Sequence, residues 1–214
     1  LLFCKPTAQL ICVGKAKGKH SQTQTEIHNL FEKHAKNGVN IVRLKGGDPL
    51  IFGRGGEEMA FLKSKNIPYE IVPGISAASA VPAYAGIPLT HRDYSQACIF
   101  VTGHLRDGTV NLNWKMLAHE KQTLVFYMGM HGSKIICEEL IKHGLKSTTP
   151  AALIVKGTTV NQEVIIGDLE NMPKIIMENK IIPPTLLIIG DVVKLHNKLK
   201  WFDPFSIKNK KNIH

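Results

Sequence analysis

The sequence predicts an α/β fold made of two α/β domains. Short apolar runs alternate with helix-forming segments in both halves of the 214-residue chain, which is the pattern of α/β architecture. The apolar run at residues 41–44 leads into a glycine-rich loop and then into a helix. Open α/β sheets form ligand sites in this way, at the carboxyl ends of their strands. A polar stretch at residues 105–113 is the best candidate linker between the halves.

The domain boundaries that we expect follow from this linker. Residues 1–103 form an N-terminal α/β domain, residues 104–204 a C-terminal α/β domain, and residues 205–214 a basic tail. The tail has the polar, lysine-containing composition that is typical of a solvated chain end.

In the first half, Thr23 or Thr25 caps a helix that extends to about Lys36. Residues 75–85 are rich in small side chains and form a helix that Pro82 should bend or divide. The remaining expected elements are strands at residues 9–13, 41–44, 69–72 and 97–101 and a helix at residues 57–65.

In the second half, the strand expected at residues 163–166 could pair with its predecessor as an antiparallel neighbour. The other elements expected in this half alternate between strands and helices. They are strands at residues 123–127, 151–155 and 185–189 and helices at residues 133–143 and 169–178.

Composition and charge limit the class of protein. The 43% hydrophobic and 21% charged content is that of a globular protein, and no apolar run approaches the roughly 20 residues that span a bilayer. Lysine and arginine exceed aspartate and glutamate by 27 − 17 = 10, which suggests a polyanionic partner. The four cysteines are far apart and form no CxxC pair, so we expect no metal site, no disulfide framework and a reducing compartment.

Three segments carry more specific information than the composition and the alternation of strands and helices. They are Val13-Gly-Lys15, the run Val-Arg-Leu-Lys-Gly-Gly-Asp-Pro-Leu-Ile-Phe-Gly-Arg-Gly-Gly-Glu-Glu at residues 42–58, and residues 72–94 with Val-Pro-Gly-Ile-Ser at their start and Ala-Gly-Ile-Pro-Leu-Thr-His-Arg-Asp-Tyr at their end. Together they resemble the uroporphyrinogen-III C-methyltransferases of the tetrapyrrole methylase family. Segments 101–104, 123–129 and 157–162 continue the resemblance in the family's order, so it covers roughly residues 9–203.

The resemblance implies a tetrapyrrole methylase fold with S-adenosylmethionine bound in the cleft between two α/β domains. It implies transfer of two methyl groups to uroporphyrinogen III, which yields precorrin-2 for sirohaem and cobalamin biosynthesis, with S-adenosylhomocysteine as the other product. It also implies a homodimer that binds a polycarboxylate tetrapyrrole and neither nucleic acid nor membrane.

Carried over position by position, the resemblance implies roles for individual residues. Lys15 matches a proposed proton donor, and Arg54 has both a catalytic and a substrate-binding role. Substrate contacts also fall on Glu57, Arg92 and His104. Cofactor contacts fall on Gly46, Gly47, Asp48, Ile51, Ser76, Ala77, Met128 and Gly157.

The chemistry of the substrate agrees with this assignment. Uroporphyrinogen III carries eight carboxylates, and the planar guanidinium of arginine binds a carboxylate through two parallel hydrogen bonds. The methyl donor already carries its leaving-group activation, so the protein's share is mainly positioning and exclusion of water. A site rich in glycine and poor in acid–base residues is consistent with a protein that positions the reactants while the methyl donor supplies the activation.

Each candidate also has a structural interpretation that the residues alone leave open. Asp48 can cap the following turn, and Ser76 can cap a helix. Met128 alone is typical of a core residue, Lys15 of an exposed side chain and His104 of a loop histidine.

The chain departs from the family pattern at its start. The family begins with a further strand, a glycine- and proline-rich loop and a Tyr-Asp segment with a proposed proton-accepting aspartate, and none of these precedes Leu1 here. We therefore expect a fragment, and the activity of this chain alone stays open. A fusion to a dehydrogenase–chelatase partner is also open, as is the compartment, with the cytoplasm as default and an organelle as the alternative.

Three other functions compete with this one. A different precorrin methyltransferase is disfavoured by segments 52–58 and 90–94, which are specific to the uroporphyrinogen branch. A ribosomal RNA methyltransferase of the same fold is suggested by the charge but lacks an RNA-reading motif. An inactive fragment is supported by the missing N-terminal pattern alone.

Overall fold

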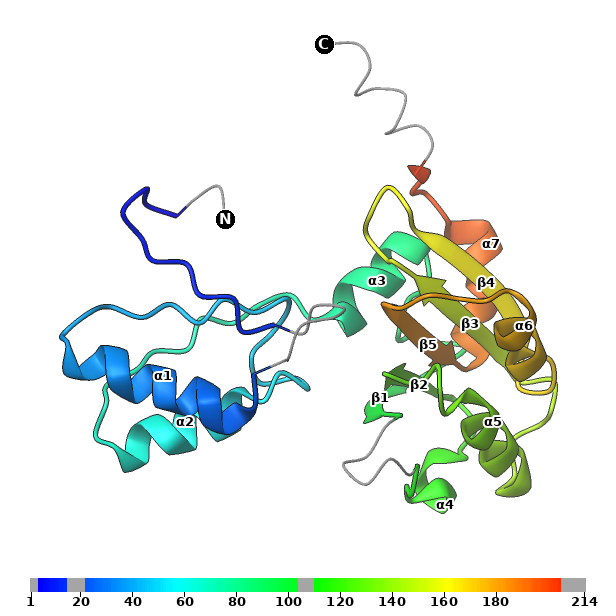
Figure 1. Ribbon diagram of the computed structural model, residues 1–214. Coiled ribbons are helices and arrows are strands. Elements are labelled where there is room, and N and C mark those ends of the chain that lie inside the picture. The colour runs from blue at the N-terminus through cyan, green and yellow to red at the C-terminus, as the bar shows by residue number, and fades with distance from the viewer. Residues whose placement is uncertain (1–3, 15–21, 104–109, 205–214) are drawn as a thin grey trace, which may run out of the picture. The chain divides into compact units, whose positions relative to one another are not determined.

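The computed structural model describes residues 4–14, 22–103 and 110–204. The chain divides into two compact units, Leu1–Gly74 and Ile75–His214 (Figure 1). The boundary that we expected lay near residue 103. In the structure the strand Ala97–Thr102 pairs with the strand Gln122–Tyr127, and these hydrogen bonds join the region before residue 103 to the second unit.

The first unit contains the helices α1 (Gln24–Lys36) and α2 (Gly55–Ser64). A capping box begins α1: the Thr23 side chain accepts the N–H of Glu26, and the Glu26 carboxylate accepts the N–H of Thr23. The ring of His28 stacks on Phe61 of α2, with 4.3 Å between ring centroids. Thr23 is therefore the cap, and the helix ends at the predicted residue.

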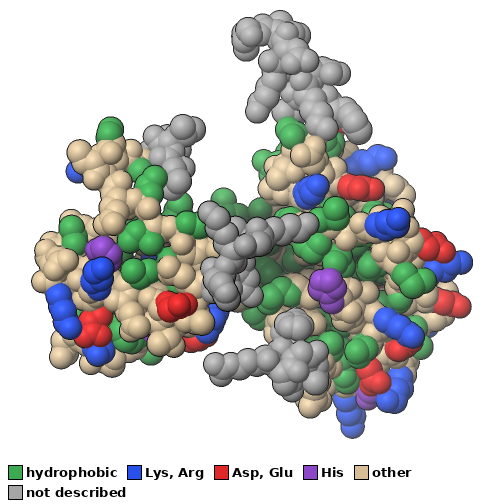
Figure 2. Space-filling model, viewed as in Figure 1, with side chains coloured by type: hydrophobic (Ala, Val, Ile, Leu, Met, Phe, Trp, Pro, Cys, Tyr) green, Lys and Arg blue, Asp and Glu red, His purple; other side chains and the backbone are tan. Residues whose placement is uncertain are grey.

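The strands predicted at residues 9–13, 41–44 and 69–72 are not found in the described part of the first unit. Their apolar side chains are exposed, with 58% for Leu10, 85% for Val42 and 79% for Val72, and Figure 2 shows apolar side chains on the surface of this unit. A strand requires a hydrogen-bonded neighbour as well as an apolar run. The sequence contains the apolar runs, but the described residues of the first unit form no hydrogen-bonded strand pair. The prediction of these three strands was therefore wrong.

The second unit is built on one five-stranded sheet, with the strands in the order β1-β2-β5-β3-β4. β1 is parallel to β2, whereas β5 is antiparallel to both of its neighbours and β4 is antiparallel to β3. The carboxyl ends of β1, β2 and β3 therefore meet at one edge of the sheet. The strands are β1 (Ala97–Thr102), β2 (Gln122–Tyr127), β3 (Pro150–Val155), β4 (Glu163–Asp168) and β5 (Thr185–Ile189).

These five strands confirm the predicted ones to within two residues at each end, including the antiparallel pairing of residues 163–166. Side chains alternate between the two faces of the sheet. Phe126 belongs to one core with Ile136 and Leu140 of α5, while the adjacent Val125 belongs to a second core with Ala78 of α3. Both faces of the sheet are thus covered by helices.

The helices of the second unit are α3 (Ala77–Ala85), α4 (Trp114–Leu117), α5 (Ser133–Lys142), α6 (Met172–Glu178) and α7 (His196–Leu199), with a 3₁₀ helix at Asp191–Leu195. Pro82 lies inside α3, and of the two expected effects, a bend or a division of the helix, the division does not occur. Pro82 is buried, on a helix whose Ala78 and Ala85 belong to a core with the sheet, and this packing offsets the backbone hydrogen bond that proline cannot donate. α4, α7 and the 3₁₀ helix were not predicted, because each is only about one turn long and shows no helical periodicity.

Candidate functional site

The candidate residues divide between the two units. Lys15 and His104 lie outside the described residues, as does most of the linker predicted at residues 105–113. In the first unit the candidates occupy one loop and the start of α2. They are Gly46, Gly47, Asp48, Ile51, Arg54 and Glu57. In the second unit they are Ser76, Ala77, Arg92, Met128 and Gly157.

Asp48 organises the loop of the first unit. One carboxylate oxygen accepts the N–H of Leu50 at 2.9 Å, and the other accepts the N–H of Gly74 at 3.0 Å. The hydrogen bonds from Gly74 and then Leu50 hold the pKa of the Asp48 carboxyl below its ordinary value. Asp48 therefore caps its own turn and joins it to a segment 26 residues away. The turn-capping role that the sequence analysis gave as the structural interpretation of Asp48 is thus present.

The backbone of this loop is tightly folded. A Cβ atom added at Gly55 would lie 2.5 Å from the carbonyl oxygen of Pro49, so glycine is required there for close approach. Arg54 adopts a left-handed conformation with φ of 60° and serves as the N-cap of α2. An added Cβ at Gly46 would meet no atom within 4 Å, so the backbone at Gly46 is open to a ligand.

Arg54 and Glu57 form a bidentate ion pair at the start of α2. The Arg54 Nε lies 3.0 Å from Glu57 Oε1, and Nη2 lies 2.7 Å from Oε2. Both side chains are about half exposed, and the bond to Glu57 raises the pKa of Arg54. The structure thus brings together two residues that were predicted separately as substrate contacts.

Glu58 was not among the predicted site residues, and it is buried. Its carboxylate accepts hydrogen bonds from Lys45 Nζ at 3.2 Å, Arg43 Nε at 3.3 Å and Gln24 Nε2 at 3.3 Å. This ionic cluster fixes α2 to the chain segment that leads into the glycine loop. The signal that could have revealed it is the alternation of Arg43 and Lys45 with apolar residues in a run otherwise typical of a buried strand.

In the second unit, Ser76 and Met128 are held together by Tyr127. Ser76 is the N-cap of α3, but its own side chain makes no capping hydrogen bond. Its hydroxyl instead shares a hydrogen bond with the Tyr127 hydroxyl, which also accepts the N–H of Ala78 at 2.8 Å. Met128 follows directly in a left-handed conformation, with φ of 55° and 54% exposure. Ala77, the first residue of α3, is exposed beside them.

Gly157 lies just after β3 and packs against α3. A Cβ atom there would lie 2.6 Å from Cγ1 of Val81, so only glycine lets the two elements approach. The Gln162 side chain accepts the N–H of Thr158 at 2.7 Å and donates to the carbonyl of Tyr84 at 3.3 Å. This clamp holds the turn after β3 against α3.

Arg92 lies in the tight turn closed by the bridge between His91 and Ser95. Its side chain is exposed. The backbone N–H of His91 donates to the Ser95 carbonyl at 2.8 Å, and the reverse bond is 2.9 Å long. The turn is therefore rigid while the guanidinium is accessible to an anionic ligand.

The model of the family "Tetrapyrrole (Corrin/Porphyrin) Methylases" matches residues 3–173 of the chain. The chain belongs to the tetrapyrrole methylases. The siroheme synthase of Nitrosomonas europaea is 55% identical over 199 residues, which cover 93% of this chain and 42% of that protein. The siroheme synthase of Pseudomonas fluorescens strain Pf0-1 is 54% identical over 203 residues, which cover 95% of this chain and 44% of that protein. This tetrapyrrole methylase chain thus spans less than half the length of these curated relatives.

Solved structures of tetrapyrrole methylases have the same fold. The uroporphyrin-III C-methyltransferase of Thermus thermophilus, in complex with S-adenosylhomocysteine, is 36% identical with a TM-score of 0.69. The match covers 80% of this chain and 74% of that one. A cobalt precorrin-4 methyltransferase is 25% identical with a TM-score of 0.75, and the match covers 88% of this chain and 77% of that one.

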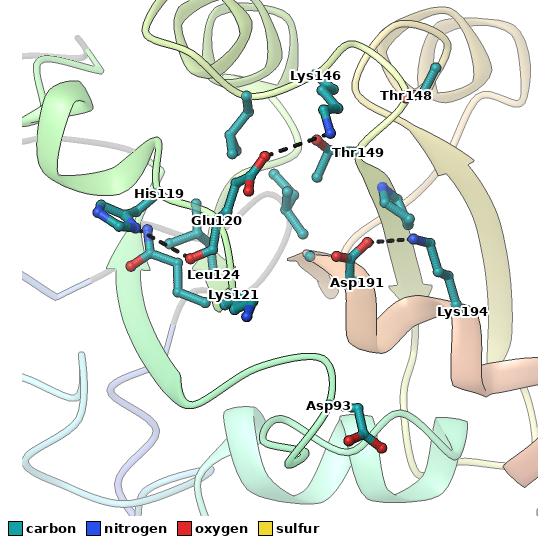
Figure 3. A pocket seen from close by; sticks show the side chains of 15 residues that line it. Asp93, His119, Glu120, Lys121, Leu124, Lys146, Thr148, Thr149, Asp191 and Lys194 are labelled. Carbon is teal, nitrogen blue, oxygen red and sulfur yellow. Dashed lines mark hydrogen bonds and ion pairs between the residues drawn. The ribbon is translucent and has the colours of Figure 1, made fainter.

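A hollow of about 230 Å³ opens at the other edge of the sheet of this tetrapyrrole methylase, where β2 and β3 begin and β5 ends (Figure 3). Four of its charged side chains form local ion pairs, with Lys194 Nζ 2.6 Å from Asp191 and Lys146 Nζ 3.7 Å from Glu120. None of the predicted site residues lines it. The candidates Ser76, Ala77, Met128 and Gly157 lie instead at the edge where β2 and β3 end. Arg92 lies in the turn before β1, next to Asp93, which lines the hollow.

The described residues lack two features, a metal-binding cluster and a membrane-spanning helix. They contain no group of three or more His, Cys, Asp or Glu side chains placed to hold a metal ion. None of the helices in the described part has both the length and the apolar character needed to span a bilayer.

Proposed function

We propose that the chain is an S-adenosylmethionine-dependent methyltransferase that transfers two methyl groups to uroporphyrinogen III, giving precorrin-2 for sirohaem synthesis. The observation that carries the proposal is the convergence of Ser76, Ala77, Met128 and Gly157 on one sheet edge of a tetrapyrrole methylase. Further support comes from the Thermus thermophilus relative, a uroporphyrin-III C-methyltransferase complexed with S-adenosylhomocysteine.

The residues present fit that cofactor. Gly46 leaves its backbone open, Ala77 is exposed at the first position of α3, and Met128 is exposed between the partly buried Tyr127 and the buried Gly129. Such groups accept a folded small-molecule ligand through backbone hydrogen bonds and apolar contact. We assign Gly46, Gly47, Asp48 and Ile51 to one part of the cofactor contact and Ser76, Ala77, Met128 and Gly157 to the other.

When bound, S-adenosylmethionine supplies a methyl group on a positively charged sulfur. The residues of this chain position the reactants. Asp48 fixes the glycine loop through the N–H groups of Leu50 and Gly74. Arg54, Glu57, Arg92 and His104 hold the substrate, with the guanidinium groups binding its carboxylates. Lys15 takes the proton-donor role.

We further propose a cytoplasmic homodimer that acts on a small-molecule tetrapyrrole, and a product that serves cobalamin synthesis as well. The resemblance in sequence supports these points. The similarity to a cobalt precorrin-4 methyltransferase supports a second candidate, methylation of a later precorrin. The higher identity to the Thermus thermophilus enzyme favours uroporphyrinogen III.

The test is anaerobic incubation of the chain with uroporphyrinogen III and methyl-labelled S-adenosylmethionine, followed by mass analysis of the tetrapyrrole. A gain of two methyl groups is the expected result. Faster methylation of a later precorrin would instead establish the second candidate. Absence of both transfers, together with absence of S-adenosylhomocysteine binding, would refute the assignment for this chain. A matched Arg92→Gln variant should bind S-adenosylhomocysteine normally and methylate poorly.

A further inference from the structure

The Tyr127 hydroxyl occupies an unusual place in the second unit. A helix N-cap side chain normally accepts the N–H of the second or third helical residue. Ser76 is the N-cap of α3 and does not do so. The N–H of Ala78, the second residue of α3, donates instead to Tyr127 Oη at 2.8 Å. α3 is therefore capped by a side chain that is 49 residues away in the sequence.

Tyr127 is itself firmly held. It is the last residue of β2, paired with Thr102 of β1 on one side and Leu186 of β5 on the other. Its carbonyl accepts the N–H of Gly103 at 2.7 Å. Its ring meets Phe100 edge-on, with 6.4 Å between centroids. The hydroxyl is thus a fixed point of the sheet.

Tyr127 connects the start of α3 with the residue that follows β2, and both places contain proposed cofactor contacts. Its hydroxyl contacts Ser76 and the first turn of α3, where Ala77 lies, and its backbone continues directly into Met128. A helix N-terminus carries unsatisfied N–H groups whose direction depends on the placement of the first turn. Any shift of that turn relative to Met128 would change the spacing of the contacts on either side of the ligand.

We propose that Tyr127 is a positioning residue for the methyl donor: its hydroxyl sets the spacing between Ser76–Ala77 and Met128. This inference rests on the proposed function of the same edge. Tyr127 is not among the cofactor contacts that the family resemblance implies. Tyr127 acts through α3, so its loss affects the affinity for the cofactor and leaves the affinity for the tetrapyrrole unchanged.

The test compares Tyr127→Phe with Tyr84→Phe in the full chain. Tyr84 lies on the same helix, and its ring packs against Trp201 and Phe202, so this control removes a hydroxyl elsewhere on α3. Calorimetric titration with S-adenosylhomocysteine should show about tenfold weaker binding for Tyr127→Phe, the scale expected for lost hydrogen bonds, and unchanged binding for Tyr84→Phe. In methyl transfer, the KM for S-adenosylmethionine should rise while the KM for uroporphyrinogen III stays constant.

Two further measurements separate positioning from general damage. Amide exchange at residues 77–80 should accelerate in Tyr127→Phe while the strands of the sheet keep their protection. In a Ser76→Ala background, loss of the Tyr127 hydroxyl should weaken binding less than it does in the parent chain, because the shared hydrogen bond is already absent.

The outcomes are distinct. If the parent chain binds S-adenosylhomocysteine and Tyr127→Phe binds within twofold of it, the positioning role is refuted and the proposed function stands. The same conclusion follows if the two KM values rise together. If the parent chain does not bind S-adenosylhomocysteine, the proposed function fails and the inference fails with it. Should Tyr127→Phe not fold, Ser76→Ala tests the shared hydrogen bond alone, and unchanged S-adenosylhomocysteine binding in that variant would refute the coupling.

Discussion

The guanidinium of Arg54 and the carboxylate of Glu57 form two parallel hydrogen bonds, 3.0 Å and 2.7 Å long, on a half-exposed surface. This is the geometry with which arginine binds the carboxylates of a ligand. Glu57 therefore holds the guanidinium in one orientation, and a substrate carboxylate would meet a preorganised group. The pair is too exposed to contribute much to stability, because such pairs are typically worth about 1 kcal/mol or less.

Arg54→Lys tests whether substrate binding depends on the planar guanidinium group. The ammonium keeps the charge but cannot donate two parallel hydrogen bonds, so the KM for uroporphyrinogen III should rise about tenfold. The affinity for S-adenosylhomocysteine, measured by calorimetry, should not change. Arg54→Gly is the companion variant, because glycine adopts the observed φ of 60° without strain. Its unfolding free energy should lie within about 1 kcal/mol of the parent value. A KM of Arg54→Lys equal to or below the parent value would contradict the binding role.

Removal of Glu58 should destabilise the first unit. Glu58→Ala leaves Lys45 and Arg43, both partly buried, without the buried carboxylate that pairs them, a change that typically costs about 3 to 5 kcal/mol. Urea denaturation followed by a probe in the first unit measures the loss. Glu57→Ala is the matched control on the same helix, since its side chain is exposed and its removal should cost less than about 1 kcal/mol. Equal losses in the two variants would disprove the buried cluster's role.

Asp48 makes the stability of the first unit depend on pH. Its folded-state pKa is lowered by the N–H groups of Gly74 and Leu50, relative to an ordinary value of 3.8. The ionised form is therefore the stabilising one. Its contribution is complete above the ordinary pKa and disappears as the pH falls through the lowered folded value. The melting temperature of Asp48→Asn should accordingly fall less than that of the parent chain between pH 4 and pH 2, measured by circular dichroism. Glu163→Gln, on an exposed strand end, should follow the parent curve.

Gly157→Ala should disturb the turn after β3. The added Cβ would lie 2.6 Å from Cγ1 of Val81, and such overpacking typically costs about 1 to 3 kcal/mol. The same movement should weaken S-adenosylhomocysteine binding. Val81→Ala combined with Gly157→Ala should recover most of the lost stability, because it removes the clashing methyl groups. A double variant as unstable as the single one would show that the space beside Val81 is not the cause.

The cysteines should separate into two reactivity classes. Burial raises the pKa of Cys98 to about 11 and that of Cys137 to about 12, and the thiolate is the reactive form. Cys4 and Cys12 are exposed. A thiol-reactive dye at pH 8 should label two thiols rapidly in the native chain and all four in denaturant. Cys4→Ser combined with Cys12→Ser should abolish the rapid phase, and its persistence would show that a buried thiol reacts.

The sequence by itself determined which residues could bear the chemistry and where most elements of the second unit lie. The strands at residues 123–127, 151–155 and 185–189 were readable because buried strands are continuous apolar runs. The glycine loop and Arg54 were readable because glycine clusters and charged loop residues stand out locally. The family resemblance added roles that composition and periodicity could not supply.

Only the tertiary structure decided which elements pair and which side chains meet. The apolar runs at residues 9–13, 41–44 and 69–72 satisfy the strand pattern, yet ladder hydrogen bonds depend on a neighbour that a local pattern does not contain. Glu58 became a buried ionic centre, and Tyr127 became the cap of α3, through contacts across 13 and 49 residues of sequence. Local sequence fixes backbone preference and side-chain chemistry, whereas the placement of a hydroxyl or carboxylate opposite its partner depends on the packing of the whole unit.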